Sequence, residues 1–307
     1  MSFRRERVAL ALVAFPMAVL AAFTLVPTAL GVALAFFEWS GGDVGPGGAG
    51  RPAFVGWGHF ASLAADDRFR AALVNTLAYV VLVVPASTVA GFVVAVPLHA
   101  PWFRGRLLAR MVFFLPTIVS LVAVGFVWRW ILDDHSGLLN WGLAQLGIHH
   151  PPSWLQSGRW PFAWIVLVST WRQVGFCIVL YLAAFETISP RLYEAAEIDG
   201  ATRLGLIRHV TWPQVWPMTL FLLVTGAISA LQVFDVVFVM TGQQETPATT
   251  VLNLEIFRQF QFGHLGRASA IGVVILLLTA IVTAGLLLRP VRRVRMPRGA
   301  FAGGTER

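Results

Sequence analysis

Residues 194–213 read EAAEIDGATRLGLIRHVTWP and lie between two hydrophobic runs that are each long enough to cross a membrane. The stretch is polar, charged and interrupted by glycine. A connector between two spans needs neither this length nor this composition. We therefore predict that the segment binds another molecule, and the sequence around it indicates on which side of the membrane.

The composition is typical of a membrane protein with several spans. Of 307 residues, 57% are hydrophobic and 12% are charged, and the mean hydropathy is +0.73. Soluble domains carry about 25% charged residues. The net charge of +8 does not indicate nucleic-acid binding, because the positive residues stand at the ends of apolar runs, where they act as topology signals.

Six runs have the length of about 20 residues that a bilayer-spanning helix requires. They cover Val8–Phe37, Ala71–Val96, Leu107–Leu132, Trp160–Phe185, Trp216–Met240 and Ala268–Leu288. The predicted fold class is therefore all-α, a polytopic membrane protein with six transmembrane helices. The first run is too long for the apolar part of a signal peptide, so we expect a retained span. Prolines inside the runs, such as Pro27 and Pro116, predict kinks.

The distribution of arginine predicts the orientation. The N-terminus, the loop at 104–110, the loop at 191–208 and the C-terminal tail hold 15 arginines, against seven on the other side. Positive residues are enriched in cytoplasmic loops. We therefore expect both termini and the 194–213 segment to be cytoplasmic.

Several chemistries are excluded or disfavoured by the residues present. The chain has no lysine, so it contains no Gly-x-x-x-x-Gly-Lys-Ser/Thr loop for binding ATP phosphates. No catalytic constellation and no metal site is predicted: His149-His150 reads as a solvated loop, and the Asp133-Asp134-His135 run reads as a cap at a membrane end. The single cysteine, Cys177, excludes an intramolecular disulfide.

The 194–213 segment and its borders predict two short helices joined by a turn. Pro190 suits the first turn of a helix, and Gly200 suits a left-handed turn between two helices. Leu204, Ile207 and Val210 then recur at three-residue intervals, as on one face of a second helix, and Pro213 with Pro217 is expected to close the loop. From physical arguments alone, an ordinary amphipathic loop lying on the bilayer surface is as good an interpretation of this segment as a helix pair that binds a partner.

This segment resembles the "EAA" cytoplasmic loop of ABC-importer permeases, which docks on the ATP-hydrolysing subunit. Ile207 stands where that family most often has Phe, so size and apolarity are kept. The resemblance implies a type I ABC-importer permease fold and gives a role in coupling to the ATPase to Glu194, Ala195, Ala196, Asp199, Gly200, Ala201, Ile207 and Pro213.

Motifs along most of the chain resemble the carbohydrate-uptake branch, of the maltose F or glycerol-phosphate A permease type. They are Phe54-Val55-Gly56, Asn75-Thr76-Leu77, Phe114-Leu115-Pro116, Trp128, Gly137-Leu138-Leu139-Asn140, Trp171-Arg172, Phe234-Asp235 and Thr241-Gly242 with Thr249. The resemblance implies a sugar or polyol as substrate, a related second permease in a heterodimer, two ATP-binding subunits and an extracytoplasmic solute-binding protein. ATP and Mg would be bound by the partner ATPase, so this chain would hold no cofactor and would not be an enzyme.

Polar residues within the spans are candidates for the translocation path, because burying charge in lipid is costly. They are Arg172 and Gln173 in the fourth span, and Gln232 and Asp235 in the fifth. Two alternatives stay open for them: a cavity that binds substrate, or a structural pair between Arg172 and Asp235. Aromatic residues such as Tyr181 are candidates to stack on a sugar ring, although packing is the commoner role.

The expected organisation is an N-terminal helix with an external Gly-rich loop (residues 1–70), a core permease domain (71–290, with the coupling loop at 190–217) and a basic cytoplasmic tail (291–307). The expected location is the inner membrane. Alternatives to sugar import are an ABC permease for another solute and a stand-alone secondary transporter. The latter would need intramembrane carboxylates, for which Asp235 and Glu186 are the candidates.

Overall fold

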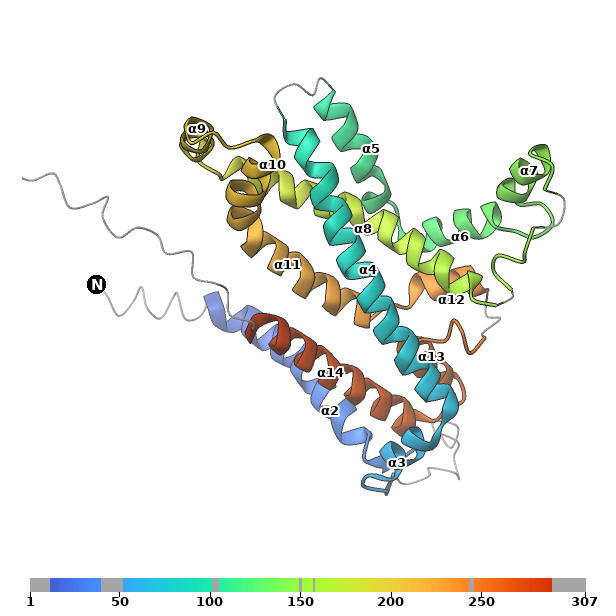
Figure 1. Cartoon of the computed structure of the whole chain (residues 1–307). Helices are drawn as coiled ribbons and strands as arrows, with labels where there is room; N and C mark the ends of the chain where they lie inside the picture. Colours follow the sequence, from blue (N-terminus) through green and yellow to red (C-terminus); the bar gives the residue numbers. More distant parts are fainter. Residues whose placement is uncertain are drawn as a thin grey trace, which may run out of the picture. The chain divides into compact units, whose positions relative to one another are not determined.

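The computed structural model describes residues 12–39, 52–100, 105–148, 151–156, 158–242 and 246–288. These residues fold into helices and one pair of short strands (Figure 1). The helices are η1 (Ala21–Leu25), α2 (Val26–Leu34), α3 (Gly58–Ala65), α4 (Asp67–His99), α5 (Arg106–Ile118), α6 (Leu121–Ile131), α7 (Leu138–Gln145), α8 (Trp160–Glu186), α9 (Pro190–Ile198), α10 (Arg203–Leu206), η3 (Ile207–Thr211), α11 (Trp212–Leu231), α12 (Asp235–Thr241), α13 (Leu252–Gln261) and α14 (Leu265–Leu288). Strands β1 (Phe37–Glu38) and β2 (Ala53–Phe54) pair antiparallel.

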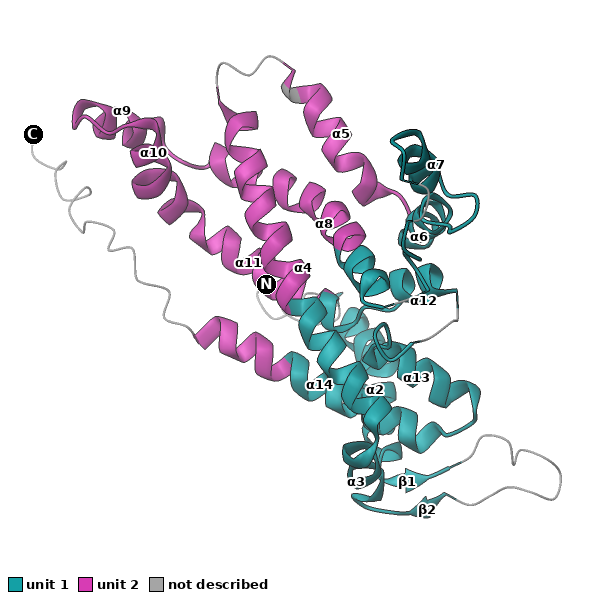
Figure 2. Cartoon of the chain, turned by 45° about the vertical axis from the view of Figure 1, so that its right-hand side comes forward, with its two compact units in different colours: residues 1–80, 121–166, 230–279 teal, residues 81–120, 167–229, 280–307 magenta. Residues whose placement is uncertain are grey.

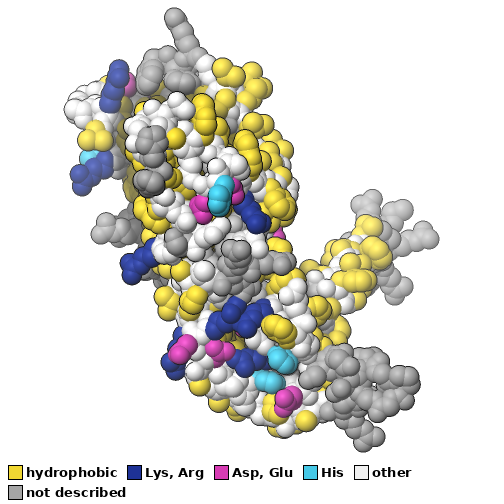
Figure 3. Space-filling view, turned by 90° about the vertical axis from the view of Figure 1, so that its right-hand side faces the viewer, with side chains coloured by type: hydrophobic (Ala, Val, Ile, Leu, Met, Phe, Trp, Pro, Cys, Tyr) yellow, Lys and Arg dark blue, Asp and Glu magenta, His cyan; other side chains and the backbone are white. Residues whose placement is uncertain are grey.

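The all-α membrane fold is confirmed. In the described residues, five helices are long and apolar enough to span a membrane, or six if one sharply bent pair counts as a single span. The five are Leu12–Leu34, Asp67–His99, Trp160–Glu186, Arg203–Leu231 and Leu265–Leu288. Hydrophobic side chains are spread over much of the face in Figure 3, and charged side chains are confined to a few clusters on it.

The third predicted span, Leu107–Leu132, is not one straight helix. It consists of α5 and α6, which are bent by 96° across the break at Val119 and Ser120. Val119 has an extended backbone (φ −69°, ψ 140°), so the helical hydrogen-bond ladder stops there. Hydropathy measures how apolar a run is and carries no information about whether its backbone stays helical.

The fifth predicted span, Trp216–Met240, is also divided. Helix α11 ends at Leu231, and a separate short helix, α12, runs from Asp235 to Thr241 and is capped by Gly242, which is left-handed (φ +59°). Asp235 stands in the first turn of α12, where the helix dipole favours a negative charge.

The first predicted span, Val8–Phe37, extends too far at its C-terminal end, because Phe37 lies in β1. Residues 8–11 fall outside the described ranges.

The prolines act differently from one another. Helix α4 continues through Pro85 without a break, and α5 contains Pro116 three residues before the bend. Two widened π turns, η1 and η3, each end two residues before a proline, Pro27 and Pro213 respectively. A proline ring clashes with the carbonyl four residues earlier. A π turn, with its bonds five residues back, moves that carbonyl away.

The chain divides into two compact units (Figure 2). Unit 1 comprises residues 1–80, 121–166 and 230–279. Its core gathers buried side chains from α3, α4, α13 and α14, among them Leu63, Phe69, Leu252 and Ile271. In the same unit α6 packs closely on α12, where Gly125 leaves room for Val239.

Side chains of α4 also hold the start of α13 within unit 1. The amide of Asn75 donates to the carbonyls of Pro247 (2.8 Å) and Thr250 (2.9 Å). The hydroxyl of Thr76 accepts from the backbone N–H of Leu252 at 3.0 Å. These bonds satisfy backbone groups that the irregular segment before α13 would otherwise leave unpaired.

Unit 2 comprises residues 81–120, 167–229 and 280–307. Its core is formed by α4, α8 and α11, with fully buried Tyr181 and Ile178 from α8 and Leu222 from α11. Glycines bring helices close together in this unit, as is common where lipid supplies no hydrophobic driving force. A Cβ at Gly175 of α8 would overlap the carbonyl oxygen of Phe113 in α5 and lie 2.8 Å from the Thr117 hydroxyl.

The predicted division at residues 70 and 290 stays a prediction, and the basic tail at 291–307 lies outside the described residues. The Gly-rich loop that follows residue 39 and the His149-His150 pair also fall outside them.

Replacing Gly175 with Ala is expected to destabilise the protein, because the new methyl group meets backbone of α5 that cannot rotate away. Overpacking of this kind costs about 1–3 kcal/mol. The midpoint of thermal unfolding of the detergent-solubilised chain measures the loss. Gly285→Ala in α14 is the matched control, because no atom lies within 4 Å of its added Cβ. Equal midpoints for the two variants would contradict the close α5–α8 contact.

Candidate functional site

The 190–217 loop begins with α9, whose ends follow from its border residues. Pro190 is the first residue of the helix, where its missing N–H leaves no hydrogen bond unmade. At the other end, Gly200 has φ +80°. The N–H of Ala201 donates to the carbonyl of Ala196 (2.9 Å), and the N–H of Gly200 donates to that of Glu197 (3.0 Å). This pair of bonds is the Schellman C-cap. The predicted start at Pro190 and the turn at Gly200 are confirmed.

The second helix of the loop begins directly after this turn. The side-chain oxygen of Thr202 accepts a hydrogen bond from the N–H of Gly205 at 3.2 Å, which caps α10. Helix α10 then widens into the π turn η3 and continues into α11. The result is one helix of 29 residues, Arg203–Leu231.

Pro213 and Pro217 do not interrupt the helix, because both lie inside it, and the predicted boundary of the loop at residue 217 stays a prediction. The preceding π turn accommodates Pro213: the N–H of Trp212 donates to the carbonyl of Ile207, five residues back. The short second helix is thus the first part of a membrane-spanning helix, and no flexible joint separates the two.

The predicted coupling residues all lie on these two helices and the turn between them. Four are exposed and four are partly buried. Exposed are Glu194, Ala195, Asp199 and Gly200, and partly buried are Ala196, Ala201, Ile207 and Pro213.

Two large apolar side chains stand out from this polar surface. Ile198 is 87% exposed and Leu204 is 74% exposed, and they flank the Gly200 turn on either side. The predicted apolar stripe is divided, because Val210 packs on the core of unit 2 while Leu204 points to solvent. Sequence reasoning missed Ile198. Its position between two acidic residues next to the turn glycine is the signal that was present.

The candidate path residues belong to different units. Arg172 and Gln173 lie on α8 in unit 2, and Gln232 and Asp235 lie at the α11–α12 break in unit 1. The Nε of Arg172 is buried and has no hydrogen-bond partner among the described residues. Whether Arg172 binds substrate or pairs with Asp235 stays a prediction.

Gln232 lines a cavity of about 800 Å³ in unit 1. The cavity lies along α2 and α14, which run side by side in Figures 1 and 2, and it also touches α13 through Asn253. Most of its lining is apolar or small, with Thr28, Ser269 and Thr279 as further polar side chains. This volume lies within the usual range of ligand pockets, about 300–1,000 Å³.

Tyr181 is a packing residue and is not available to stack on a sugar. Its side chain is 0% exposed in the core of unit 2, and its hydroxyl donates to that of Thr219 at 3.0 Å. Trp171, by contrast, is 44% exposed on the same helix.

The Asp133-Asp134-His135 run is a structural cap, as predicted. One carboxylate oxygen of Asp133 accepts hydrogen bonds from the N–H groups of Ser136 (2.8 Å) and His135 (3.1 Å) and from the Ser136 hydroxyl (2.9 Å). These bonds, led by the Ser136 N–H, lower the pKa of the Asp133 carboxyl. Asp134 accepts from the N–H of Trp154, so both carboxylates hold the chain that follows α6.

Sequence reasoning also missed a buried carboxylate, Glu255 of α13. Its side chain is 1% exposed and pairs with Arg68 of α4 (3.0 Å) and Arg258 (3.5 Å). It also accepts from the Gln259 amide at 2.6 Å, and Gln259 in turn contacts His264 at 3.1 Å. Because its charge is compensated by these partners, Glu255 serves to join α4 to α13. No local pattern identifies it, since Arg68 lies 187 residues away in the sequence.

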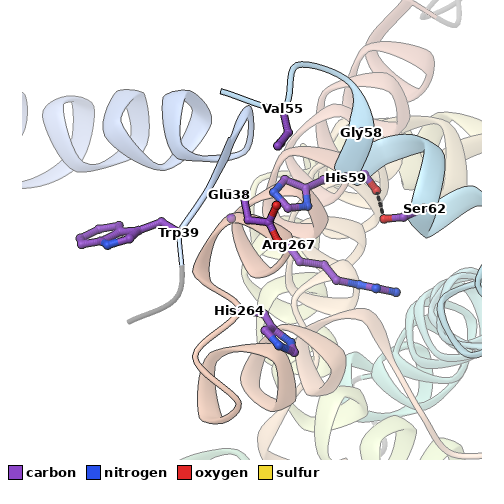
Figure 4. Close-up of a pocket in the computed structure, with 9 residues that line it drawn as sticks. Glu38, Trp39, Val55, Gly58, His59, Ser62, His264 and Arg267 are labelled. Carbon is purple, nitrogen blue, oxygen red and sulfur yellow. Dashed lines mark hydrogen bonds between the residues drawn. The ribbon is translucent and has the colours of Figure 1, made fainter. Parts of the chain in front are cut away.

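A second cavity, of about 350 Å³, lies in unit 1 beside β1 and the start of α14 and is lined by several charged and polar side chains. Figure 4 shows the side chains of Glu38 and His59 close together, with the guanidinium of Arg267 extending away from them and Trp39 pointing to the other side. Arg267 is already paired with Asp66, and a ring nitrogen of His59 contacts the carbonyl of Phe37 at 3.2 Å. The described residues contain no cluster of three or more His, Cys, Asp or Glu side chains that fits a metal ion.

These features define a class of protein: a multi-pass, all-α membrane protein with a polar helix pair that continues directly into a spanning helix. Residues 60–295 match the family model described as "Binding-protein-dependent transport system inner membrane component". The chain belongs to this family of ABC-transporter permeases, which are transport components and not enzymes.

Curated relatives agree with this assignment. The chain is 33% identical to the lactose transport system permease protein LacF of Rhizobium radiobacter over 75% of this chain and 78% of the relative. It is 30% identical to the trehalose/maltose transport system permease protein MalF of Thermococcus litoralis, over 75% and 77% of the two chains. It is 29% identical to the probable ABC transporter permease protein YurN of Bacillus subtilis, over 86% and 89%.

A solved structure supports the fold. A chain of a bacterial ABC transporter involved in the import of the acidic polysaccharide alginate superposes with a TM-score of 0.83 at 23% identity, covering 96% of this chain and 98% of that one. The ABC-importer permease fold implied by the sequence is thus confirmed.

Replacing Glu255 with Gln is expected to lower the free energy of unfolding, because Arg68 and Arg258 lose their charged partner. Hydrogen bonds to charged groups contribute about 1.5–3 kcal/mol. Thermal unfolding of the purified chain measures the change. Glu186→Gln is the control, since its pair with Arg110 is more than a third exposed on both sides and such pairs contribute about 1 kcal/mol or less. Equal losses for the two variants would contradict the role of Glu255.

Proposed function

We propose that this chain is the permease subunit of an ATP-driven importer and forms half of the translocation pathway for a sugar or related polyol. Two of its relatives are named for lactose and for trehalose and maltose, and its structural neighbour belongs to an alginate importer. The family is defined by dependence on a binding protein. We therefore expect an extracytoplasmic solute-binding protein to deliver the substrate.

A separate subunit supplies ATP hydrolysis in this proposal. The lysine-free sequence cannot form a phosphate-binding loop with its lysine, so ATP and Mg are bound by the partner. The observation that carries the proposal is the tip of the 190–217 loop, where Ile198 and Leu204 project from a charged surface. Exposed apolar side chains with a polar rim are typical of a protein-binding surface. The Schellman cap at Gly200 holds both in fixed positions, so they can fill a groove on the ATPase.

The complete importer contains this chain, a related second permease, two ATP-binding subunits and the binding protein. The arginine distribution supports an orientation with both termini and the 190–217 loop on the cytoplasmic side of the inner membrane. In that orientation the loop faces the compartment that contains ATP.

The path for the substrate includes Arg172, Gln173, Gln232 and Asp235 in this proposal. The buried Nε of Arg172 is a donor without a partner among the described residues, and leaving such a group unsatisfied costs about 1–3 kcal/mol or more. A sugar hydroxyl is a suitable acceptor. Gln232 opens onto the larger cavity of unit 1, where its amide can donate to a sugar hydroxyl.

Ile198→Asp is expected to weaken binding of the ATPase, because a charge replaces an apolar group in the docking surface. Burying one such side chain contributes about 1.5–3 kcal/mol, so the affinity should fall roughly 10- to 100-fold. Pull-down of the ATPase by the tagged permease measures it. Leu146→Asp is the matched control, as Leu146 is 79% exposed but follows α7, outside the loop. Full ATPase recovery with Ile198→Asp would contradict the proposed docking surface.

Arg172→Ala is expected to reduce uptake of radiolabelled lactose, trehalose or maltose, whichever the importer takes up fastest, while the ATPase still copurifies. The reason is loss of a buried donor in the path. Arg172→Lys, which keeps a charged donor, should retain more transport than the alanine variant. Unchanged uptake in Arg172→Ala would remove this residue from the path. Sugar uptake in a host that lacks any partner ATPase would instead favour a secondary transporter.

A further inference from the structure

The loop helix α9 is attached to the start of α11 by a side-chain hydrogen bond besides its peptide connection. The hydroxyl of Tyr193 on α9 lies 3.1 Å from the hydroxyl of Thr211, the last residue of η3. The two residues are 18 positions apart, on opposite sides of the Gly200 turn. The two helices are thus connected twice, through the peptide turn at Gly200 and through this hydrogen bond.

The π turn gives this contact a particular geometry. The Thr211 hydroxyl reaches the carbonyl of Leu206 at 3.5 Å, five residues back, as the wider turn requires. If Thr211 donates to Leu206, then Tyr193 donates to Thr211, because each hydroxyl has one proton. Tyr193 therefore contacts the one turn of this helix whose backbone is not in the α register. Such turns are frequent at functional sites and are longer by one residue than an ordinary turn.

The ring of Tyr193 packs against the core of unit 2, and Thr211 is buried at 7% exposure. The turn between the helices is held by short-range bonds alone, namely its Schellman cap and the Thr202 cap. A Cβ at Gly200 would meet no atom within 4 Å, and Asp199 next to it is exposed. The hydrogen bond and packing of Tyr193 therefore join α9 to η3 in addition to the backbone bonds of the turn, and without them only those backbone bonds resist bending at Gly200.

We infer that Tyr193 is a positioning residue for coupling: through Thr211 it transmits displacement of α9 into the π turn and so into α11. This inference rests on the proposed function, in which α9 docks on the ATPase. A push on α9 without the Tyr193–Thr211 bond bends the chain at Gly200. With the bond, the same push acts on η3 and rotates or shortens the helix that crosses the membrane.

The test uses the complete importer with a spin label on Gln214→Cys, an exposed position at the start of α11. Mg-ATP with vanadate traps the ATPase subunits closed, and the spectrum reports the fraction of label in each mobility state. In Tyr193→Phe and Thr211→Val, the change that vanadate trapping causes in the fraction of label in each mobility state should fall roughly 2- to 10-fold. One neutral hydrogen bond supplies a factor of this size. Thr211→Ser keeps the hydroxyl and should restore the change.

Tyr181→Phe is the matched control, because it removes the same kind of Tyr–Thr bond (to Thr219, 3.0 Å) inside the spans. It should leave the trapped change intact. An undiminished change in Tyr193→Phe would overturn the inference, as would an equal fall in Tyr181→Phe. Failure of the unmodified chain to retain any ATPase would instead contradict the proposed function. Copurified ATPase in normal amount with Tyr193→Phe separates weakened transmission from lost docking.

Discussion

Every backbone N–H and carbonyl inside a bilayer must find a partner within the protein, and the fold of this chain follows from that constraint. Long helices satisfy it directly, and each departure from helix needs a local solution. Asn75 and Thr76 pair the irregular segment before α13. Widened turns accommodate Pro27 and Pro213 without ending their helices. The same solution that lets the chain pass Pro213 places a non-standard turn where the 190–217 loop joins a spanning helix.

The positions of the spanning helices were predictable because apolar length is a local property of the sequence. Their breaks were not. Pro85 lies within a continuous helix, whereas the chain bends by 96° at Val119 and Ser120, which are ordinary residues for a helix in lipid. What decides such a break is which neighbours satisfy the freed backbone groups, and those neighbours are remote in sequence. The hydroxyl of Thr117, near the bend, donates to the carbonyl of Arg172, 55 residues away.

In the candidate site, too, the features set by local sequence were predictable and those set by contacts between remote residues were not. The turn at Gly200 was predictable, because a left-handed backbone is a property of glycine itself. The exposure of Ile198 was not, since it depends on how α9 is rotated against the rest of unit 2. Glu255 was missed for a related reason: a buried carboxylate reads as a surface residue until Arg68, from another helix, is placed against it. The resemblance to a known loop pointed to this segment, and it did not point to the side chains exposed at its tip.

The length of α4 has a consequence for depth in the membrane. At 1.5 Å per residue its 33 residues extend about 50 Å, while the hydrocarbon layer is about 30 Å thick. Part of the helix must therefore lie in the headgroup or water layer even when it tilts. Arg68 and Arg70 near its first turn identify the protruding end. The ionic cluster around Glu255 is attached to this end, so its charges lie at the polar boundary of the bilayer and are spared the cost of the apolar interior.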